Sequence, residues 1–420
     1  MRLKEMEKLF EMALGLGSDW YVSDIAFAPE EGRLDISIDF ERGTRFTCPE
    51  CGQEGCPVHD TVKRTWRHLN FFQFETYIHA RVPRATCEKC GVHQVQVPWA
   101  RSGSGFTLLF ESLAMALVKL MPVRAAARIL NMWSTRLWRI IHHHVDAEEA
   151  SLGLSGVVHV GLDETSSRKG HNYITVFADL DTKRVIFVAE GKGADTLEKF
   201  KAFLESHGGH ADKIELFSCD MSTAFTAGIQ KHFQKSEIVY DRFHVTKLVQ
   251  EALDEICRGE RKELPDLLRK TRYIWLRNPE NLSDKQHLRL EELRRAKYGL
   301  KSARAWSLKE FFRNIFNRDP QDMRWGEHLF DRWYFWATHS RLEPMIKVAR
   351  TLKKHKSRIL RSIETGLSNG LMEGLNSLIQ AAKAKARGFS SLKSLKALCY
   401  LVGGKFELGI TRLWWLTHTG

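Results

Sequence analysis

Three acidic residues have the types and the settings of a divalent-metal site. Asp163 follows the apolar run VVHVGL, Asp220 follows KIELFSC, and Glu373 lies in SNGLMEGLNSLIQ. Two aspartates at strand ends and a distant glutamate on a helix offer hard oxygen ligands suited to Mg²⁺ or Mn²⁺. A pair of such ions activates a water or a 3′-hydroxyl for in-line displacement at phosphorus. The three acids therefore predict a two-metal site for cutting and joining nucleic-acid phosphodiesters.

The helix that carries Glu373 is expected to have one polar face, which would point toward the metals or, in the simpler alternative, toward solvent. Its members share helical spacing: Asn369, Glu373, Asn376, Ser377 and Gln380. Two other carboxylates compete for a role. Glu164 should point to the opposite side of its strand from Asp163, and Glu364 lies among basic residues, where an ion pair is the simpler explanation.

Paired cysteines predict a structural zinc site. Cys48 and Cys51 form one Cys-x-x-Cys-Gly knuckle, Cys87 and Cys90 form a second, and 35 residues separate the two. Two knuckles complete a tetrahedral site of four sulfurs, which leaves no open coordination position. Cys56 and His59 are spare ligands; the alternative, which we favour, is a buried thiol and a surface histidine.

Residues 122–145 have the pattern of a helix-turn-helix. A short helix over residues 122–130 precedes a turn at 131–133 and a second helix with Ser134 as its N-cap. An ordinary packed helical pair is the alternative. The helix-turn-helix predicts that exposed side chains reach DNA, with the second helix in the major groove; the candidates are Arg124, Arg128, Ser134, Thr135, Arg136 and Arg139.

The elements that must position the acids form an α/β core. Three β-branched runs over residues 157–190 predict an antiparallel meander, and helix–strand–helix–strand follows to residue 244. This is the order of a ribonuclease H-like fold with a mixed five-stranded sheet, in which the strands before Asp163 and Asp220 are neighbours. An all-helical, tryptophan-bearing insertion then interrupts the core before the Glu373 helix.

The expected domains are a zinc-binding module (1–100), a helix-turn-helix (101–150), the first part of the core (151–245), the helical insertion (246–363) and C-terminal core helices (364–420). Residues 101–105 are expected to be a flexible joint. The insertion tryptophans, such as Trp325 and Trp333, are candidates for base-stacking wedges, although aromatics at helical spacing are more often core.

Composition favours a polyanionic partner. The chain of 420 residues has a net charge of +13. Residues 345–396 hold twelve Lys or Arg and two acids, which places most of that excess next to the candidate active site. Within this stretch Lys383, Lys385 and Arg387 are candidates for clamping a DNA backbone, or form a solvated helix face. No segment is typical of a signal peptide or a membrane span, so we expect a cytoplasmic protein without a membrane partner.

The stretches GLDETSSRKGHNYITVFADLDTKRV, SCDMSTAF, YDRFHV and SNGLMEGLNSLIQ, with the two cysteine knuckles upstream, resemble bacterial insertion-sequence transposases of the ISL-three group. The resemblance covers almost the whole chain. It implies a DDE transposase that binds the terminal inverted repeats of its element, with Asp163, Asp220 and Glu373 as the metal-binding triad. It also implies that Asp241 and His244, as Asp-x-x-His, lie near the active site. There His244 contacts the scissile phosphate or orients the DNA end, or is only structural.

Transposases bring two DNA ends together, so the resemblance also implies a homodimer or larger assembly on double-stranded DNA, comprising inverted repeats and target. Its setting would be a bacterial cytoplasm, at the nucleoid when bound. Two other functions stay open. One is a nuclease or resolvase of the same fold without strand transfer. The other is a non-catalytic DNA-binding regulator that uses only the zinc module and the helix-turn-helix. A regulator would not need Asp163, Asp220 and Glu373 or the long second half of the chain.

Overall fold

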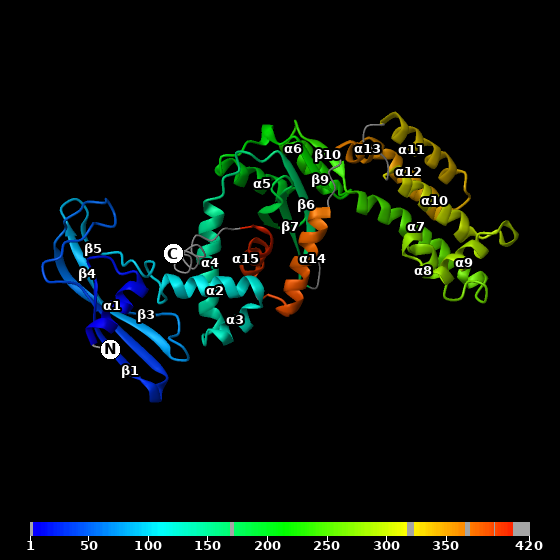
Figure 1. Cartoon of the computed structure of the whole chain (residues 1–420). Coiled ribbons are helices and arrows are strands. Elements are labelled where there is room, and N and C mark those ends of the chain that lie inside the picture. The colour runs from blue at the N-terminus through cyan, green and yellow to red at the C-terminus, as the bar shows by residue number, and fades with distance from the viewer. Residues whose placement is uncertain (1–2, 169–171, 317–322, 366–369, 390, 406–420) are drawn as a thin grey trace. The chain divides into compact units, whose positions relative to one another are not determined.

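The structure is a computed structural model of the chain, and it describes residues 3–168, 172–316, 323–365, 370–389 and 391–405 (Figure 1). The chain divides into two compact units, Met1–Glu148 and Glu149–Lys405 within these described parts. Among the described residues, no helix has both the length and the apolar character needed to span a membrane.

The first unit begins with a helix and a five-stranded sheet. The strand order is β1-β2-β4-β3, and β5 pairs with β4. A core of tryptophans and β-branched residues fills the sheet, with Trp20, Trp66 and Trp99 in edge-to-face contact. The elements are α1 (Leu3–Leu14), β1 (Tyr21–Ala28), β2 (Arg33–Asp39), β3 (Val58–Arg67), β4 (Glu75–Cys87) and β5 (Gly91–Gln94).

Three helices follow in the same unit: α2 (Leu108–Leu120), α3 (Val123–Ile129) and α4 (Ser134–Ala150). The predicted turn at 131–133 contains Asn131 with φ of 48°. The predicted N-cap is wrong: α4 begins at Ser134 itself, and the Trp133 carbonyl accepts the hydrogen bonds of the first turn. Residues 101–105, expected to be a flexible joint, are held to α2, because Arg101 and Ser104 both donate to the buried carboxylate of Glu111.

The second unit is built on a mixed sheet with strand order β10-β9-β6-β7-β8. β6, β7 and β8 form the predicted antiparallel meander, and β9 and β10 add in parallel on the other side of β6. The sheet elements and the intervening helices are β6 (His159–Arg168), β7 (Asn172–Asp179), β8 (Arg184–Glu190), α5 (Asp195–Ser206), β9 (Leu216–Cys219), α6 (Thr223–His232) and β10 (Glu237–Tyr240).

Helices cover both faces of this sheet (Figure 1). Phe217 of β9 packs with Phe200 of α5 on one face. Because Phe217 pairs with Val160, the next residue of β6, Gly161, faces the opposite side. There a Cβ on Gly161 would lie 3.0 Å from Met372. The missing side chain lets α14 (Gly370–Lys385) approach β6, and α15 (Leu392–Gly403) packs beside α14 and against β8.

Two strand ends differ from the sequence expectation. Asp163 does not end its strand, because β6 continues to Arg168 with β7 as its hydrogen-bonding partner. The polar residues after Asp163 suggested an end, but β7 pairs with their backbone groups and keeps them extended. The fifth strand stops at Tyr240, and Asp241 is the N-cap of the next helix, α7 (Arg242–Glu263).

Between β10 and α14 the described residues form helices and no strand of this sheet. They are α7, α8 (Arg272–Leu276), α9 (Asp284–Leu293), α10 (Lys301–Ile315), α11 (Met323–Thr338), α12 (Glu343–Lys354) and α13 (Lys356–Thr365). Their tryptophans divide by burial. Trp275, Trp306 and Trp333 are buried, and Trp333 donates to the carbonyl of Leu308, so the wedge interpretation of Trp333 is wrong. Trp325 is 39% exposed.

Candidate active site

The four knuckle cysteines converge in the first unit. The sulfurs of Cys48, Cys51, Cys87 and Cys90 all lie within 4.8 Å of one another. A tetrahedral zinc–thiolate site has sulfurs about 3.8 Å apart, and Cys51 and Cys87 are 3.6 Å apart. Backbone N–H groups of Cys90 and Lys89 lower the pKa of Cys87 to about 6, which favours the thiolate that zinc binds. The cluster therefore fits a structural zinc ion.

The spare ligands lie outside this cluster. Cys56 is buried and its thiol contacts the carbonyl of Gln53 at 3.4 Å. His59 lies on the surface, 3.5 Å from the carboxylate of Asp60. Both findings agree with the simpler alternative of a buried thiol and a surface histidine.

The helix-turn-helix presents most of its candidate DNA contacts to solvent. Arg124, Arg128, Thr135, Arg136 and Arg139 are exposed, and Ser134 is half-buried. The Arg136 guanidinium lies 4.8 Å from the centre of the Phe106 ring. Leu137, Ile140 and Ile141 are buried on the opposite side of α4. The arginines are thus available to a polyanion.

Asp163 and Asp220 lie at neighbouring positions in the second unit. The parallel pairing of β6 and β9 ends at Gly161 and Ser218, and each aspartate follows two residues later. Burial raises the pKa of Asp163 to about 6, and the nearby Asp220 charge contributes in the same direction. Burial likewise raises the pKa of Asp220. Asp163 is buried and Asp220 is half-buried, and neighbouring carboxylates raise the pKa of both, Asp220 that of Asp163 and Asp241 that of Asp220. Such a setting stabilises a cation.

His244 extends this acidic cluster from the first turn of α7. Asp241 is buried, and its carboxylate accepts a 2.9 Å hydrogen bond from His244 Nδ1. This hydrogen bond raises the pKa of His244, and the charges of Asp163 and Asp220 raise it further. The raised pKa favours the protonated ring, in which Nε2 also carries a proton and can donate it.

Part of the predicted polar face of α14 points at β6, whereas Ser377 of the same face is exposed. Asn376 Nδ2 donates to Asp163 Oδ2 at 2.6 Å, and Gln380 donates to Thr165. The Oδ1 atom of Asn376 is buried with no hydrogen-bond partner, so one acceptor in the site is unused. Asn369 lies outside the described residues.

Glu373 lies in the first turn of α14. Burial raises its pKa, and its charged neighbours are Asp241 and His244. Among the residues that the structure describes, the three acids do not form a group with all oxygens within 4.8 Å of one another, as the four cysteine sulfurs do. Glu373 therefore lies near the Asp241–His244 pair, whose charges affect its pKa.

Lys192 was missed by the sequence reasoning. It is exposed in the loop between β8 and α5, where its ammonium lies 4.3 Å from the centre of the Tyr173 ring. Burial raises the pKa values of Asp220 and Glu164, and the charge of Lys192 partly offsets that rise, so Lys192 lies near both. The charge of Asp220 contributes to the raised pKa of Glu164, and the charge of His244 opposes it. A lone Lys after a strand carries no distinguishing sequence signal.

The basic stretch of residues 345–396 is partly neutralised within the described part of the fold. Lys353 and Lys356 pair with Asp331, and Arg361 pairs with Glu237 and Glu364. The predicted ion pair of Glu364 is thereby confirmed. Near the site, Lys383 donates to the Ser166 carbonyl at 2.5 Å. Lys385 and Arg387 are exposed.

The buried charge of Asp163 should reduce stability above its pKa. Folding raises this pKa from 3.8 to about 6, so the folded state favours the protonated form. The associated stability is complete below the unfolded value and is lost as the pH rises through about 6. We expect Asp163→Asn to increase the free energy of unfolding at pH 8 by up to about 3 kcal/mol, and by less at pH 5. Thermal unfolding in metal-free buffer measures this.

Asp266→Asn is the matched control for that prediction, because Asp266 is an exposed carboxylate in the same unit. It should leave the unfolding temperature unchanged at both pH values. Equal stabilisation by Asp163→Asn at pH 5 and pH 8 would contradict the assigned pKa.

A zinc cluster, a helix-turn-helix and an acid-bearing mixed sheet together define a DNA-processing protein. Comparison with known families agrees with this class. A transposase family model of the ISL3 group matches residues 160–399, a helix-turn-helix domain of transposase family ISL3 matches 95–145, and a zinc finger of transposases IS204/IS1001/IS1096/IS1165 matches 44–90. The chain belongs to the ISL3 family of transposases.

Similar proteins span the whole chain. The transposase for insertion sequence element IS1557 of Mycobacterium tuberculosis is 28% identical, over 94% of this chain and 95% of its own length. The transposase for insertion sequence element IS1001 of Bordetella parapertussis is 27% identical, over 91% of this chain and 94% of its own length. The predicted family and the predicted transposase function are thereby confirmed.

Proposed function

We propose that this transposase cuts and joins DNA with a ribonuclease H-like core in which Asp163, Asp220 and Glu373 hold two Mg²⁺ or Mn²⁺ ions. The observation that carries the proposal is the strand order β10-β9-β6-β7-β8, which makes the strands of Asp163 and Asp220 neighbours. The helices α7–α13 are then an insertion within that core. The proposed domain limits are residues 1–100, 101–150, 151–245, 246–363 and 364–420.

The residues present fit hard divalent cations. Asp163 and Asp220 are carboxylates with raised pKa values, and Oδ1 of Asn376 has no hydrogen-bond partner. These oxygen atoms are ligands of the kind that hard divalent cations prefer. Glu373 lies near Asp241 and His244, and bound cations would draw its carboxylate toward Asp163 and Asp220. When bound, such ions supply an activated oxygen nucleophile and stabilise the leaving oxygen.

The chain's own groups position the DNA. Asp241 orients the His244 ring, which in its protonated form donates Nε2–H to a phosphate oxygen of the strand in the site. Lys192 approaches the same phosphates from the other side of Asp220. Lys383, Lys385 and Arg387 hold the backbone further along α14, with Lys383 restrained by Ser166. Arg124, Arg128, Ser134, Thr135, Arg136 and Arg139 contact the inverted repeat.

The pairing of two DNA ends requires at least two copies of the active site, so we propose a homodimer or larger assembly on DNA. The partners are the terminal inverted repeats and the target duplex.

The test supplies the purified chain with a duplex carrying one inverted-repeat end, a target plasmid and Mg²⁺. We expect end cleavage and a new covalent joint between end and target, resolved on denaturing gels. Hydrolysis without joined product would instead identify a nuclease or resolvase. A chain that binds the end but neither cleaves nor joins it would support the regulator.

A further inference from the structure

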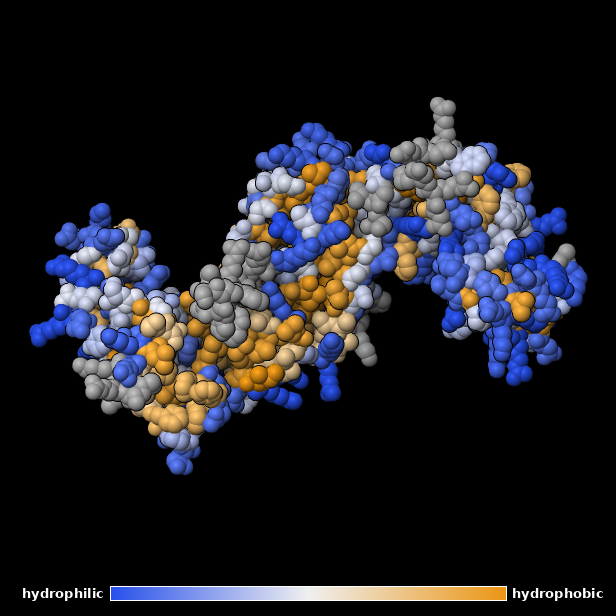
Figure 2. Space-filling model, viewed as in Figure 1, coloured by the Kyte–Doolittle hydropathy of each residue, from blue (hydrophilic) through white to orange (hydrophobic). Residues whose placement is uncertain are grey.

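A cavity of about 500 Å³ lies beside the first turns of α7. Its walls come from α7, from the segment that ends α8, and from α10, all within the second unit. Phe243, Lys247 and Gln250 are exposed on the α7 side. In Figure 2 the surface over this helical part is predominantly hydrophilic. The cavity is of the size that ordinary small ligands occupy.

The cavity and the acidic cluster share one turn of helix. Asp241 and His244 interact with each other and, through His244, with Asp163 and Asp220. Phe243, between them in sequence, is 51% exposed, lines the cavity and contacts the His244 ring edge-to-face, with the ring centres 5.7 Å apart. A DNA strand with a phosphate at His244 therefore has its adjoining nucleotide beside Phe243.

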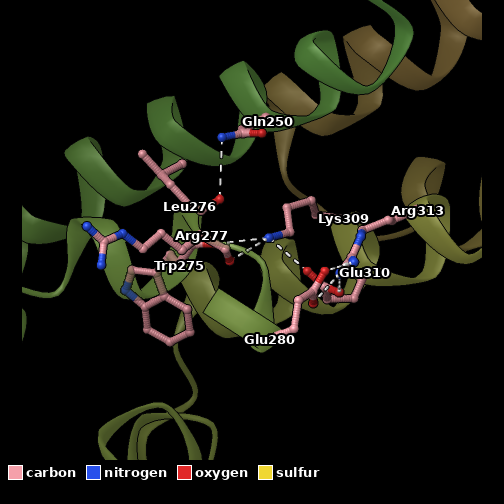
Figure 3. Close-up of polar contacts among 8 residues, drawn as sticks. All are labelled: Gln250, Trp275, Leu276, Arg277, Glu280, Lys309, Glu310 and Arg313. Atoms are coloured by element: carbon pink, nitrogen blue, oxygen red, sulfur yellow. Dashed lines mark hydrogen bonds and ion pairs between the residues drawn. The ribbon is translucent and has the colours of Figure 1, made fainter. Parts of the chain in front are cut away.

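The floor of the cavity is rigid. The Lys309 ammonium is buried and donates to the carbonyls of Trp275 and Arg277 at 3.3 and 3.2 Å, and it pairs with Glu310 at 2.8 Å (Figure 3). Arg313 pairs with Glu280 and Glu310, and Gln250 of α7 donates to the carbonyl of Leu276 (Figure 3). These contacts fix the cavity's shape, so Lys309 and Arg313 are structural cations.

Glu251 and Asp254 also line the cavity, and the carboxylate of Asp254 pairs with Arg258 and Arg272. Several other wall groups match the parts of a nucleotide. Phe243, Leu276 and Phe312 are apolar surfaces for a base, and the amides of Gln250 and Asn278 offer donors and acceptors for its edge. Arg242 and Lys247 supply positive charge for a phosphate. Burial lowers the pKa of Arg242, and the like charge of Arg313 lowers it further, so an anion nearby would stabilise the charged guanidinium, which also donates to the carbonyl of Phe316 at 3.3 Å.

We propose that this cavity receives one unpaired nucleotide of the DNA strand that lies at the acidic cluster. Its base stacks on Phe243, and its phosphate lies near Arg242 and Lys247. A base in a duplex is stacked between its neighbours, so it enters only after leaving the helix. This inference rests on the proposed function, because it assumes that DNA lies at Asp163 and Asp220.

The test measures cleavage of inverted-repeat duplexes by the full chain and by Phe243→Ala. We expect Phe243→Ala to slow cleavage roughly ten- to a hundredfold, the effect of losing one stacked base. An abasic nucleotide at one position beside the cleaved bond should slow the unaltered protein similarly. On that abasic duplex the further effect of Phe243→Ala should be under about threefold, because the stacking partner is already gone.

Two control variants make the outcome specific. Phe335 is 64% exposed on α11 and does not line the cavity, so Phe335→Ala should cleave like the unaltered protein. Phe243→Tyr keeps a ring and should cleave within a few-fold. Equal rates for Phe243→Ala and the unaltered protein, or full additivity with every abasic position, would overturn the cavity's role. Absence of any cleavage by the unaltered protein would instead overturn the proposed function.

Discussion

Replacing Asp220 with Asn is expected to slow DNA cleavage and joining by roughly a thousandfold or more, with no loss of DNA binding. Asn keeps the carbonyl-type oxygen that accepts a 3.1 Å hydrogen bond from the Ser222 backbone N–H, so the turn after β9 is preserved. It removes a negative charge that lies near Asp163 and would attract a cation. The chemical step is thus lost while the zinc module and the helix-turn-helix are untouched.

Cleavage of a labelled inverted-repeat duplex and fluorescence anisotropy on the same duplex measure the two quantities separately. Asp212→Asn is the matched control, because Asp212 is an exposed carboxylate of the same unit that pairs with Lys235 at 2.6 Å. Asp212→Asn should cleave normally. Cleavage by Asp220→Asn within tenfold of the unaltered protein would remove Asp220 from the chemistry. If the unaltered protein binds but never cleaves, the regulator is the better description.

Removal of zinc is expected to lower the unfolding temperature of the first unit by roughly 10 °C or more. Three of the four ligands lie in or against the hydrophobic core of that unit: Cys48 and Cys87 are buried in it and Cys90 packs against it. Without the ion, thiolates within 4.8 Å of one another repel or take up protons, and the two knuckles are no longer cross-linked. The loss of stability should extend to the five-stranded sheet of the first unit, which the two knuckles connect.

Zinc content and tryptophan fluorescence test this prediction, since Trp20, Trp66 and Trp99 report on the core of the first unit. Cys90→Ser should lose the bound zinc and show the lower transition without added chelator. Cys56→Ala, which removes a buried thiol outside the cluster, should keep its zinc. Full zinc content and unchanged unfolding in Cys90→Ser would show that the cluster is not the metal site.

Much of the architecture could be predicted because it depends on local pattern. The alternation of β-branched residues gave the meander β6–β8, and repeated Cys-x-x-Cys-Gly knuckles identified the zinc cluster. The limits of elements were less certain. β6 continues past Asp163 because β7 pairs with it. α4 begins at Ser134, the residue expected to be its cap, because the Trp133 carbonyl accepts the hydrogen bonds of the first turn.

Charge was the least reliable guide. The basic residues 345–396 suggested a continuous track for phosphates, yet Lys353, Lys356 and Arg361 pair with acids from other elements. Lys192, in contrast, carries no sequence signal and lies beside Asp220 and Glu164. Ion pairing depends on which elements pack together, so a count of charges along the chain does not identify the cations that remain available.

The sequence by itself determined the residue types: two strand-associated aspartates, a glutamate on an amphipathic helix, four knuckle cysteines and the family to which they belong. Only the tertiary structure decided how these groups meet. It placed Asp241 and His244 beside the acids and turned part of the polar face of α14 toward Asp163. Local pattern encodes backbone conformation and burial. The distance between side chains more than 200 residues apart depends instead on sheet order and on packing at positions such as Gly161.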